Sequence, residues 1–268
     1  MIKKEISENG LIADFFSEPS TPISKAILML GGSEGGKSWS RIKKPIDHLV
    51  QRGYSVLSLA YFKSGHLPQS LQEIPLEYFE KAFAWLSDQK EIVPDQYGII
   101  GGSKGSEAAL LLGSRYPQLK VVIGFSPSNV VWQGIPGNRF ELGKDVKSSW
   151  SSGGEGLPFL PYPSSISKRE LITLKLRKIH EEALLNAEGA DRAAIPVENI
   201  QGGILLISGE GDRLWPATPM SEQIMNRLKS KEFKYPSEHL IFKTGHNRIV
   251  MNKDSWRRVF TFLEENLG

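Results

Sequence analysis

The feature that most constrains the fold is a glycine-rich turn between a short apolar run and a helical pattern. The run Tyr97–Ile100 leads into Gly101-Gly102-Ser103-Lys104-Gly105, which has the form G-x-S-x-G. Between a strand and a helix, this motif forces Ser103 into a sharp, strained turn with its hydroxyl above the sheet. Glycines two positions before and after the serine are needed because side chains there would collide across the bend. The pattern predicts a nucleophilic serine. The alternative is a glycine-rich turn in which the serine has no catalytic role.

Strand and helix patterns alternate along most of the chain. Apolar runs predict strands at 25–30, 54–60, 97–100, 120–125, 203–208 and 238–242, and helical spacing covers 42–52, 76–86, 107–115, 218–228 and 254–267. Residues 2–6 and 11–16 flank Asn9-Gly10, a strong tight-turn signal, and predict a leading hairpin. This α/β alternation implies a mostly parallel central sheet with helices on both faces. Together with G-x-S-x-G, it resembles the α/β-hydrolase fold.

Residues 126–200 interrupt this alternation and show no clear strand. The segment is too long for an ordinary connection, and one helix is expected over Lys168–Asn186. We expect one domain over residues 1–268, with 126–200 inserted as a lid above the serine. The apolar side chains expected to line an acyl pocket there are Trp132, Trp150, Phe159 and Tyr162. The alternative is that the segment lies on the surface and that these side chains pack only against other parts of the same segment.

A serine hydroxyl becomes a good nucleophile only when a base takes its proton and an acid orients that base. His246 lies beside a glycine just after the apolar strand 240–242, in a loop that would present it at the sheet edge, and is the expected base. His180 falls within a helical pattern and His239 begins a strand, which disfavours both.

The expected acid is Asp212, in the loop after the strand 203–208. Glu210 competes from the same loop, but Asp212 is farther past the strand and leads into Arg-Leu-Trp-Pro. Asp191 is a weaker choice because no strand ends there. The chain order of serine, acid and histidine is that of α/β-hydrolases.

An oxyanion hole needs two backbone N–H groups. Lys104 supplies one at the start of the helix after the serine. The second is expected from the loop Gly31–Gly36, with Ser33 as the first choice and Gly32 close behind. Glu34 would order this loop or a water molecule. The loop is not a dinucleotide motif, because the spacing G-x-G-x-x-G is absent.

Composition excludes several classes of site. The chain has no cysteine, which excludes disulfides, thiolate zinc sites and a cysteine nucleophile, and no metal or other cofactor is expected. A net charge of +3 from scattered basic residues gives no argument for nucleic-acid binding. No apolar stretch is long enough to span a membrane, and the N-terminus lacks the apolar core of a signal peptide. We therefore expect a cytoplasmic enzyme acting on a small molecule.

The sequence does not indicate an oligomeric state. The only candidates that it offers for phosphate contacts are Lys43, Lys44, Lys63 and Arg139.

Several blocks resemble the acyl-CoA thioesterase and bile-acid-CoA:amino-acid N-acyltransferase family, in its C-terminal catalytic domain. They are Gly-Gly-Ser-Glu-Gly-Gly at 31–36, Leu-Ala-Tyr-Phe at 59–62, Leu-Pro at 67–68, Pro-Leu-Glu-Tyr-Phe-Glu-Lys-Ala at 75–82, Ile-Gly-Gly-Ser-Lys-Gly-Ser-Glu at 100–107, Leu-Leu-Ile-Ser-Gly-Glu-Gly-Asp-Arg-Leu-Trp-Pro at 205–216 and Gly-His at 245–246. The resemblance covers roughly residues 25–265. It implies that Ser103, Asp212 and His246 form a catalytic triad.

The same resemblance implies a serine hydrolase that cleaves an acyl thioester, such as an acyl-CoA, or an ester through an acyl-enzyme. Two-domain members carry an N-terminal β-sandwich, which we do not expect here. Members that conjugate amino acids use a cysteine where this chain has Ser103, and a serine ester is less prone to aminolysis than a thioester. Water is therefore the expected acyl acceptor. The alternatives are a carboxylesterase or dienelactone-type hydrolase, an acyltransferase in a biosynthetic pathway, and a ligand-binding pseudoenzyme; the intact serine, acid and histidine disfavour the last.

Overall fold

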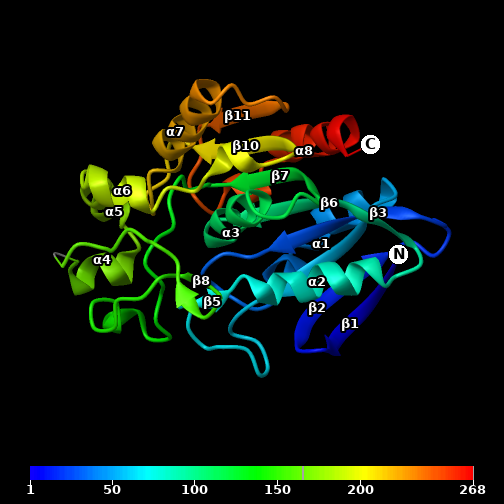
Figure 1. Cartoon of the computed structure of the whole chain (residues 1–268), viewed down its shortest axis with the longest axis horizontal. Coiled ribbons are helices and arrows are strands. Elements are labelled where there is room, and N and C mark those ends of the chain that lie inside the picture. The colour runs from blue at the N-terminus through cyan, green and yellow to red at the C-terminus, as the bar shows by residue number, and fades with distance from the viewer. Residues whose placement is uncertain (165, 268) are drawn as a thin grey trace.

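The structure is a computed structural model that describes residues 1–164 and 166–267, and an eight-stranded sheet runs through its centre (Figure 1). The strand order is β1-β2-β4-β3-β6-β7-β10-β11. The bounds are β1 Ile2–Glu8, β2 Leu11–Ser17, β3 Ser24–Leu30, β4 Ser55–Ala60, β6 Ile92–Gly102, β7 Leu119–Phe125, β10 Gly203–Gly209 and β11 Ser237–Phe242. β2 is antiparallel to β1 and β4, and the other pairs are parallel. The mostly parallel central sheet predicted from the sequence is confirmed.

The leading hairpin forms as expected. Asn9 and Gly10 connect β1 and β2 with φ values of 53° and 79°, and Glu8 pairs with Leu11. Two consecutive residues with positive φ give the turn twist that matches paired antiparallel strands. The hairpin adds antiparallel strands to one edge of the parallel sheet.

Helices cover both faces of this sheet because its central strands are apolar on both sides. Leu28 and Leu30 belong to a core cluster with α2 and α3, whereas Ile27 and Met29 belong to a second cluster with α1 and α8. The helices are α1 Lys43–Gln51, α2 Glu77–Ser87, α3 Lys104–Gly113, α7 Ala217–Ser230 and α8 Lys253–Asn266, with short 3₁₀ turns at Ser38–Arg41, Arg139–Glu141, Val197–Asn199 and Ile249–Met251. None of the helices in the described part of the chain is long and apolar enough to cross a membrane.

The segment between β7 and β10 differs in detail from the expectation. It contains two short strands, β8 Trp150–Ser152 and β9 Glu155–Gly156, and β8 also pairs with β5, Ile74–Pro75. The expectation of no strand was wrong, because strands of two or three residues carry no readable periodicity. The Gly153-Gly154 turn, with φ values of 61° and 82°, closes this hairpin.

The single helix expected over Lys168–Asn186 was also wrong. The structure has three short helices, α4 Lys168–Thr173, α5 Arg177–Leu184 and α6 Ala187–Arg192. Leu174 has a left-handed backbone with φ of 52°, which ends α4, and Asn186 caps α6 through Gly189 N–H. In Figure 1, these helices lie beyond the ends toward which the arrows of β7 and β10 point. The inserted segment therefore occupies the edge of the sheet where the parallel strands end.

The turn between β6 and α3 depends on two glycines, as the motif predicts. A Cβ atom on Gly101 would lie 2.1 Å from the carbonyl oxygen of Gly105, and one on Gly105 would lie 2.3 Å from the carbonyl oxygens of Leu30 and Gly31. Both obstacles are backbone atoms, which cannot move aside as a flexible side chain does. The absence of a side chain at these positions lets α3 start directly against β3.

Gly105→Ala should therefore destabilise the protein strongly. We expect a loss of about 3 kcal/mol or more in the free energy of unfolding, since the methyl group overlaps backbone. Gly143→Ala is the matched control, because a Cβ there meets no atom within 4 Å. Urea unfolding of both variants checks the prediction, and equal stabilities would contradict it.

Candidate active site

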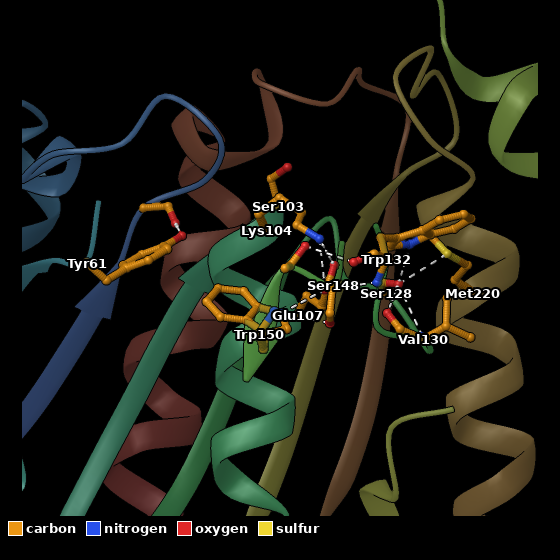
Figure 2. Close-up of polar contacts among 12 residues, drawn as sticks. Tyr61, Ser103, Lys104, Glu107, Ser128, Val130, Trp132, Ser148, Trp150 and Met220 are labelled. Atoms are coloured by element: carbon orange, nitrogen blue, oxygen red, sulfur yellow. Dashed lines mark hydrogen bonds and ion pairs between the residues drawn. The ribbon is translucent and has the colours of Figure 1, made fainter. Parts of the chain in front are cut away.

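Ser103 sits in a backbone conformation that few non-glycine residues adopt. Its φ and ψ are 55° and −121°, at the junction of β6 and α3. Its N–H donates to Phe125 O at 2.8 Å, and its carbonyl accepts from the N–H groups of Ser106 and Glu107. Strain of this kind costs roughly 1–3 kcal/mol and persists only where the surroundings enforce it. The side chain consequently projects above the helix, away from the polar groups beneath it (Figure 2).

The expected base and acid lie beside this hydroxyl. His246 Nε2 is 2.9 Å from Ser103 Oγ, and His246 Nδ1 is 2.6 Å from Asp212 Oδ2. The other carboxylate oxygen of Asp212 accepts the N–H groups of Leu214 and Trp215 at 2.9 and 3.2 Å. With the Nδ1 proton bonded to the carboxylate, the Nε2 lone pair faces the serine. The structure thus brings the three predicted residues into one hydrogen-bonded chain.

The competing candidates lie elsewhere. The side chains of Glu210 and Asp191 are exposed to solvent. His239 bonds to Ser208 Oγ at 2.7 Å, away from the serine. His180 is buried, and its Nδ1 lies 2.9 Å from Leu176 O. Asp212 is therefore the carboxylate that the fold places against His246.

The loop after β3 approaches the serine closely. A Cβ atom on Gly32 would lie 3.1 Å from the Cβ of Ser103. The Gly32 N–H donates to Glu34 Oε1 at 2.9 Å, so Glu34 orders the loop as expected but also occupies this donor. The Ser33 N–H has no acceptor among the described residues. The Lys104 N–H is the first of α3 and has no carbonyl acceptor within the helix. Of the two loop candidates, Ser33 is therefore the one with a free donor.

A buried ion pair lies directly beneath Ser103. Lys104 Nζ contacts the two carboxylate oxygens of Glu107 at 2.8 and 2.7 Å, and both side chains are almost completely buried (Figure 2). Glu107 Oε1 also accepts the Trp132 N–H at 3.1 Å and the Trp150 Nε1–H at 2.8 Å. Burial raises the pKa of Glu107 and lowers the pKa of Lys104, while their mutual attraction opposes both shifts. This pair ties the start of α3 to the inserted segment.

Trp132 and Trp150 do not line the cavity over the serine, contrary to the expectation. Both are fully buried, because their N–H groups are held by Glu107 at the base of the inserted segment. Phe159 packs against the same core cluster as Trp150. Tyr162 does line the cavity, with its ring stacked on Trp132 at a centroid distance of 5.7 Å. Burial among apolar groups raises the pKa of the Tyr162 hydroxyl.

Two cavities meet at the serine. The first, here called the apolar cavity, has a volume of about 440 Å³ and reaches into the inserted segment. The second, here called the narrow cavity, has a volume of about 170 Å³ and runs between the Gly31–Gly36 loop and Val250. Ser103, His246, Glu34 and Asn247 line both. The apolar lining that sequence patterns did not identify is Ile135, Pro136, Leu142, Leu171, Leu174, Leu176, Leu214 and Trp215.

Breaking the ion pair should destabilise the fold. Glu107→Gln keeps an oxygen acceptor for both tryptophan N–H groups but leaves the Lys104 ammonium buried without a counter-charge. We expect a loss of about 3–5 kcal/mol. Adding Lys104→Met removes the buried charge, so the double variant should recover a large part of that loss. Urea unfolding measures both, and a double variant no more stable than Glu107→Gln would contradict this account.

His180 should make stability sensitive to acid. Burial lowers its pKa from 6.5 to about 4, with the charges of Lys104 and His246 acting in the same direction. The unfolded chain therefore binds a proton that the folded chain does not, and stability falls as pH drops from 6.5 toward 4. His180→Gln removes this contribution, which is roughly 3 kcal/mol across the interval. The free energy of unfolding of the wild-type protein should fall more between pH 7 and pH 4.5 than that of His180→Gln. An equal fall in the two proteins would contradict the prediction.

Comparison with known proteins agrees with the fold. The structure superposes on the α/β hydrolase GrgF from Penicillium sp. sh18 with a TM-score of 0.67 at 16% identity, covering 100% of this chain and 99% of that one. It also superposes on the Pyrococcus furiosus esterase Pf2001 with a TM-score of 0.65 at 16% identity, covering 100% and 91%. The predicted α/β-hydrolase architecture is confirmed.

Sequence comparison identifies relatives. The chain is 28% identical to mouse acyl-coenzyme A amino acid N-acyltransferase 1 over 85% of this chain and 49% of that protein. It is 28% identical to human acyl-coenzyme A thioesterase 1 over 74% and 44%. The chain thus spans about half the length of these relatives. Residues 74–249 match the family described as BAAT / Acyl-CoA thioester hydrolase C terminal. The chain therefore belongs to the BAAT and acyl-CoA thioester hydrolase C-terminal family.

Proposed function

We propose that this protein is a serine hydrolase that cleaves acyl thioesters of the acyl-CoA type. The observation that carries the proposal is the hydrogen-bonded chain from Ser103 through His246 to Asp212, placed where the two cavities meet. A hydroxyl, an imidazole and a buried carboxylate in this order are the parts that nucleophilic acyl transfer requires. The names of the relatives support the substrate class, since they include acyl-CoA thioesterases.

In the proposed reaction, His246 Nε2 takes the proton of Ser103 Oγ as the oxygen attacks the thioester carbonyl. The negative charge that develops on the carbonyl oxygen is stabilised by the backbone N–H groups of Lys104 and Ser33. The imidazolium, held by Asp212, then protonates the departing thiolate as the carbon–sulfur bond breaks. Water, deprotonated by the same imidazole, attacks the serine ester; the bond to Ser103 Oγ breaks, the imidazolium returns the proton to this oxygen, and the carboxylic acid is released.

The apolar cavity supports an acyl group of largely hydrocarbon character. Half of it is built by the inserted segment, which we propose acts as a lid over the site within a single domain. Arg177 links the two parts: its N–H and guanidinium donate to the carbonyl oxygens of Arg213 and Asp212 at 3.0 and 3.1 Å. The start of α5 and the loop that carries the acid are thereby fixed together.

Acyl transfer to an amine is the second candidate, because some relatives are N-acyltransferases. Ser103 favours hydrolysis, since an oxygen ester is less prone to aminolysis than a thioester. Mass spectrometry of products formed with and without added glycine or taurine decides between the two. Free acid under both conditions supports hydrolysis, and an amide as the main product would contradict it.

Ser103→Ala should abolish the reaction. We expect turnover to fall by about three orders of magnitude or more, because no other group can form the acyl-enzyme. Ser106→Ala is the control, since Ser106 lies in the first turn of α3, close to Ser103 in sequence, and its buried hydroxyl has no hydrogen-bond partner within the described structure. A panel of acyl-CoAs of different chain lengths with thiol release as readout, run beside short nitrophenyl esters, measures the activity. Ser103→Ala with wild-type turnover would contradict the proposal, and activity confined to the nitrophenyl esters would indicate a carboxylesterase.

A further inference from the structure

A third hollow lies next to the narrow cavity. This hollow, here called the basic cavity, has a volume of about 290 Å³ and shares Ile42 and Val250 with the narrow cavity. It lies on the face of the sheet covered by α1 and α8, whereas the apolar cavity reaches into the inserted segment. A substrate bound across Ser103 can therefore extend in two directions, one apolar and one toward the basic cavity.

Both charged side chains that line the basic cavity, Lys44 and Lys253, are positive. The lining also contains His48 and no acidic side chain. Within the described residues, neither lysine has a carboxylate partner within ion-pair distance. Asp254, next to Lys253 in sequence, is paired with Arg257. Two cationic side chains at this cavity are therefore available to a bound anion.

The N-terminus of α1 adds to the positive potential, because α1 starts at Lys43 with no acidic residue in its first turn and no side-chain cap. Lys253 is the first residue of α8, whose N-terminus is capped by Asn252 and carries Asp254 in its first turn. Lysine in the first turn of a helix opposes the helix dipole, which favours negative charge there. A bound phosphate would relieve both this unfavourable interaction and the repulsion between the lysines.

The remaining lining is apolar and partly aromatic. Trp256 and Phe260 both line this cavity, with ring centroids 5.6 Å apart. The His48 ring packs edge-on against Phe260, with a centroid distance of 5.8 Å. Met251 at the rim is 66% exposed. A flat heteroaromatic ring finds an apolar surface here, next to the cationic groups.

We propose that the basic cavity binds the phosphorylated nucleotide end of the coenzyme A leaving group. This inference rests on the proposed function, because it assigns a place to one half of the substrate. Coenzyme A joins its thiol through a slender pantetheine arm to a diphosphate and a 3′-phosphoadenosine. The narrow cavity holds the arm beside His246, which protonates the sulfur. Lys44 and Lys253 bind phosphate, and the adenine ring of coenzyme A packs over Met251, Trp256 and Phe260.

The first test measures binding without catalysis. Adenosine 3′,5′-bisphosphate, titrated by calorimetry, should bind the wild-type protein, and Lys44→Met with Lys253→Met should weaken it by about ten-fold or more. The single variants Lys44→Met and Lys253→Met are each compared with Lys43→Met, which removes one positive charge from a side chain that does not line the cavity. Absence of binding, or equal losses in Lys43→Met and the two single variants, would overturn the inference whether or not the protein is an enzyme.

The second test separates the two halves of the substrate. The double variant should raise KM for an acyl-CoA with little change in kcat, and should leave KM unchanged for the N-acetylcysteamine thioester of the same acyl group. An unchanged KM for acyl-CoA would overturn the inference while leaving the proposed function intact. If the bisphosphate binds at the lysines but neither thioester is hydrolysed, the proposed function fails and the anion site stands.

Discussion

The buried ion pair between Lys104 and Glu107 is the interaction on which the organisation of the site depends. Two charges removed from water are tolerated only if they are paired and their remaining hydrogen-bonding capacity is used. Glu107 meets this condition by accepting the N–H groups of Trp132 and Trp150, which belong to the inserted segment. The same interaction therefore holds the first turn of α3, from which the Lys104 N–H points, and the base of the inserted segment.

Strain at Ser103 is the second constraint, and glycines make it possible. The serine keeps its left-handed conformation because α3 starts against β3 with no side chain at Gly101 or Gly105 to separate them. The parallel strands then end at one edge of the sheet, so the loops after β3, β6, β10 and β11 converge there. The narrow cavity at that edge shares Ile42 and Val250 with the basic cavity, so the proposed substrate has separate places for its acyl chain and its charged leaving group.

Much of this could be predicted from the sequence, where a local pattern reflects a physical requirement. The turn at Gly101–Gly105, the Asn9-Gly10 hairpin and the buried strands each carry such a pattern, and the positions of Asp212 and His246 follow from strand ends. Tertiary contacts carry no comparable signal. Trp132 and Trp150 were expected in a pocket, but a carboxylate far away in sequence draws their N–H groups into the core. The basic cavity was recognisable only in part: Lys44 was one of four candidates for phosphate contacts, but Lys253 was not, because these two lysines line one cavity only after α1 and α8 pack on the same face.

The central claim is that Ser103 is a nucleophile activated by His246. Labelling with a fluorophosphonate, followed by mass spectrometry of the intact and digested protein, tests it most directly, because the reagent needs an activated serine but no knowledge of the substrate. The account predicts one label per chain, on the peptide that contains Ser103, and labelling slowed by about three orders of magnitude in His246→Ala. A label on another residue, or labelling of His246→Ala at the wild-type rate, would contradict it.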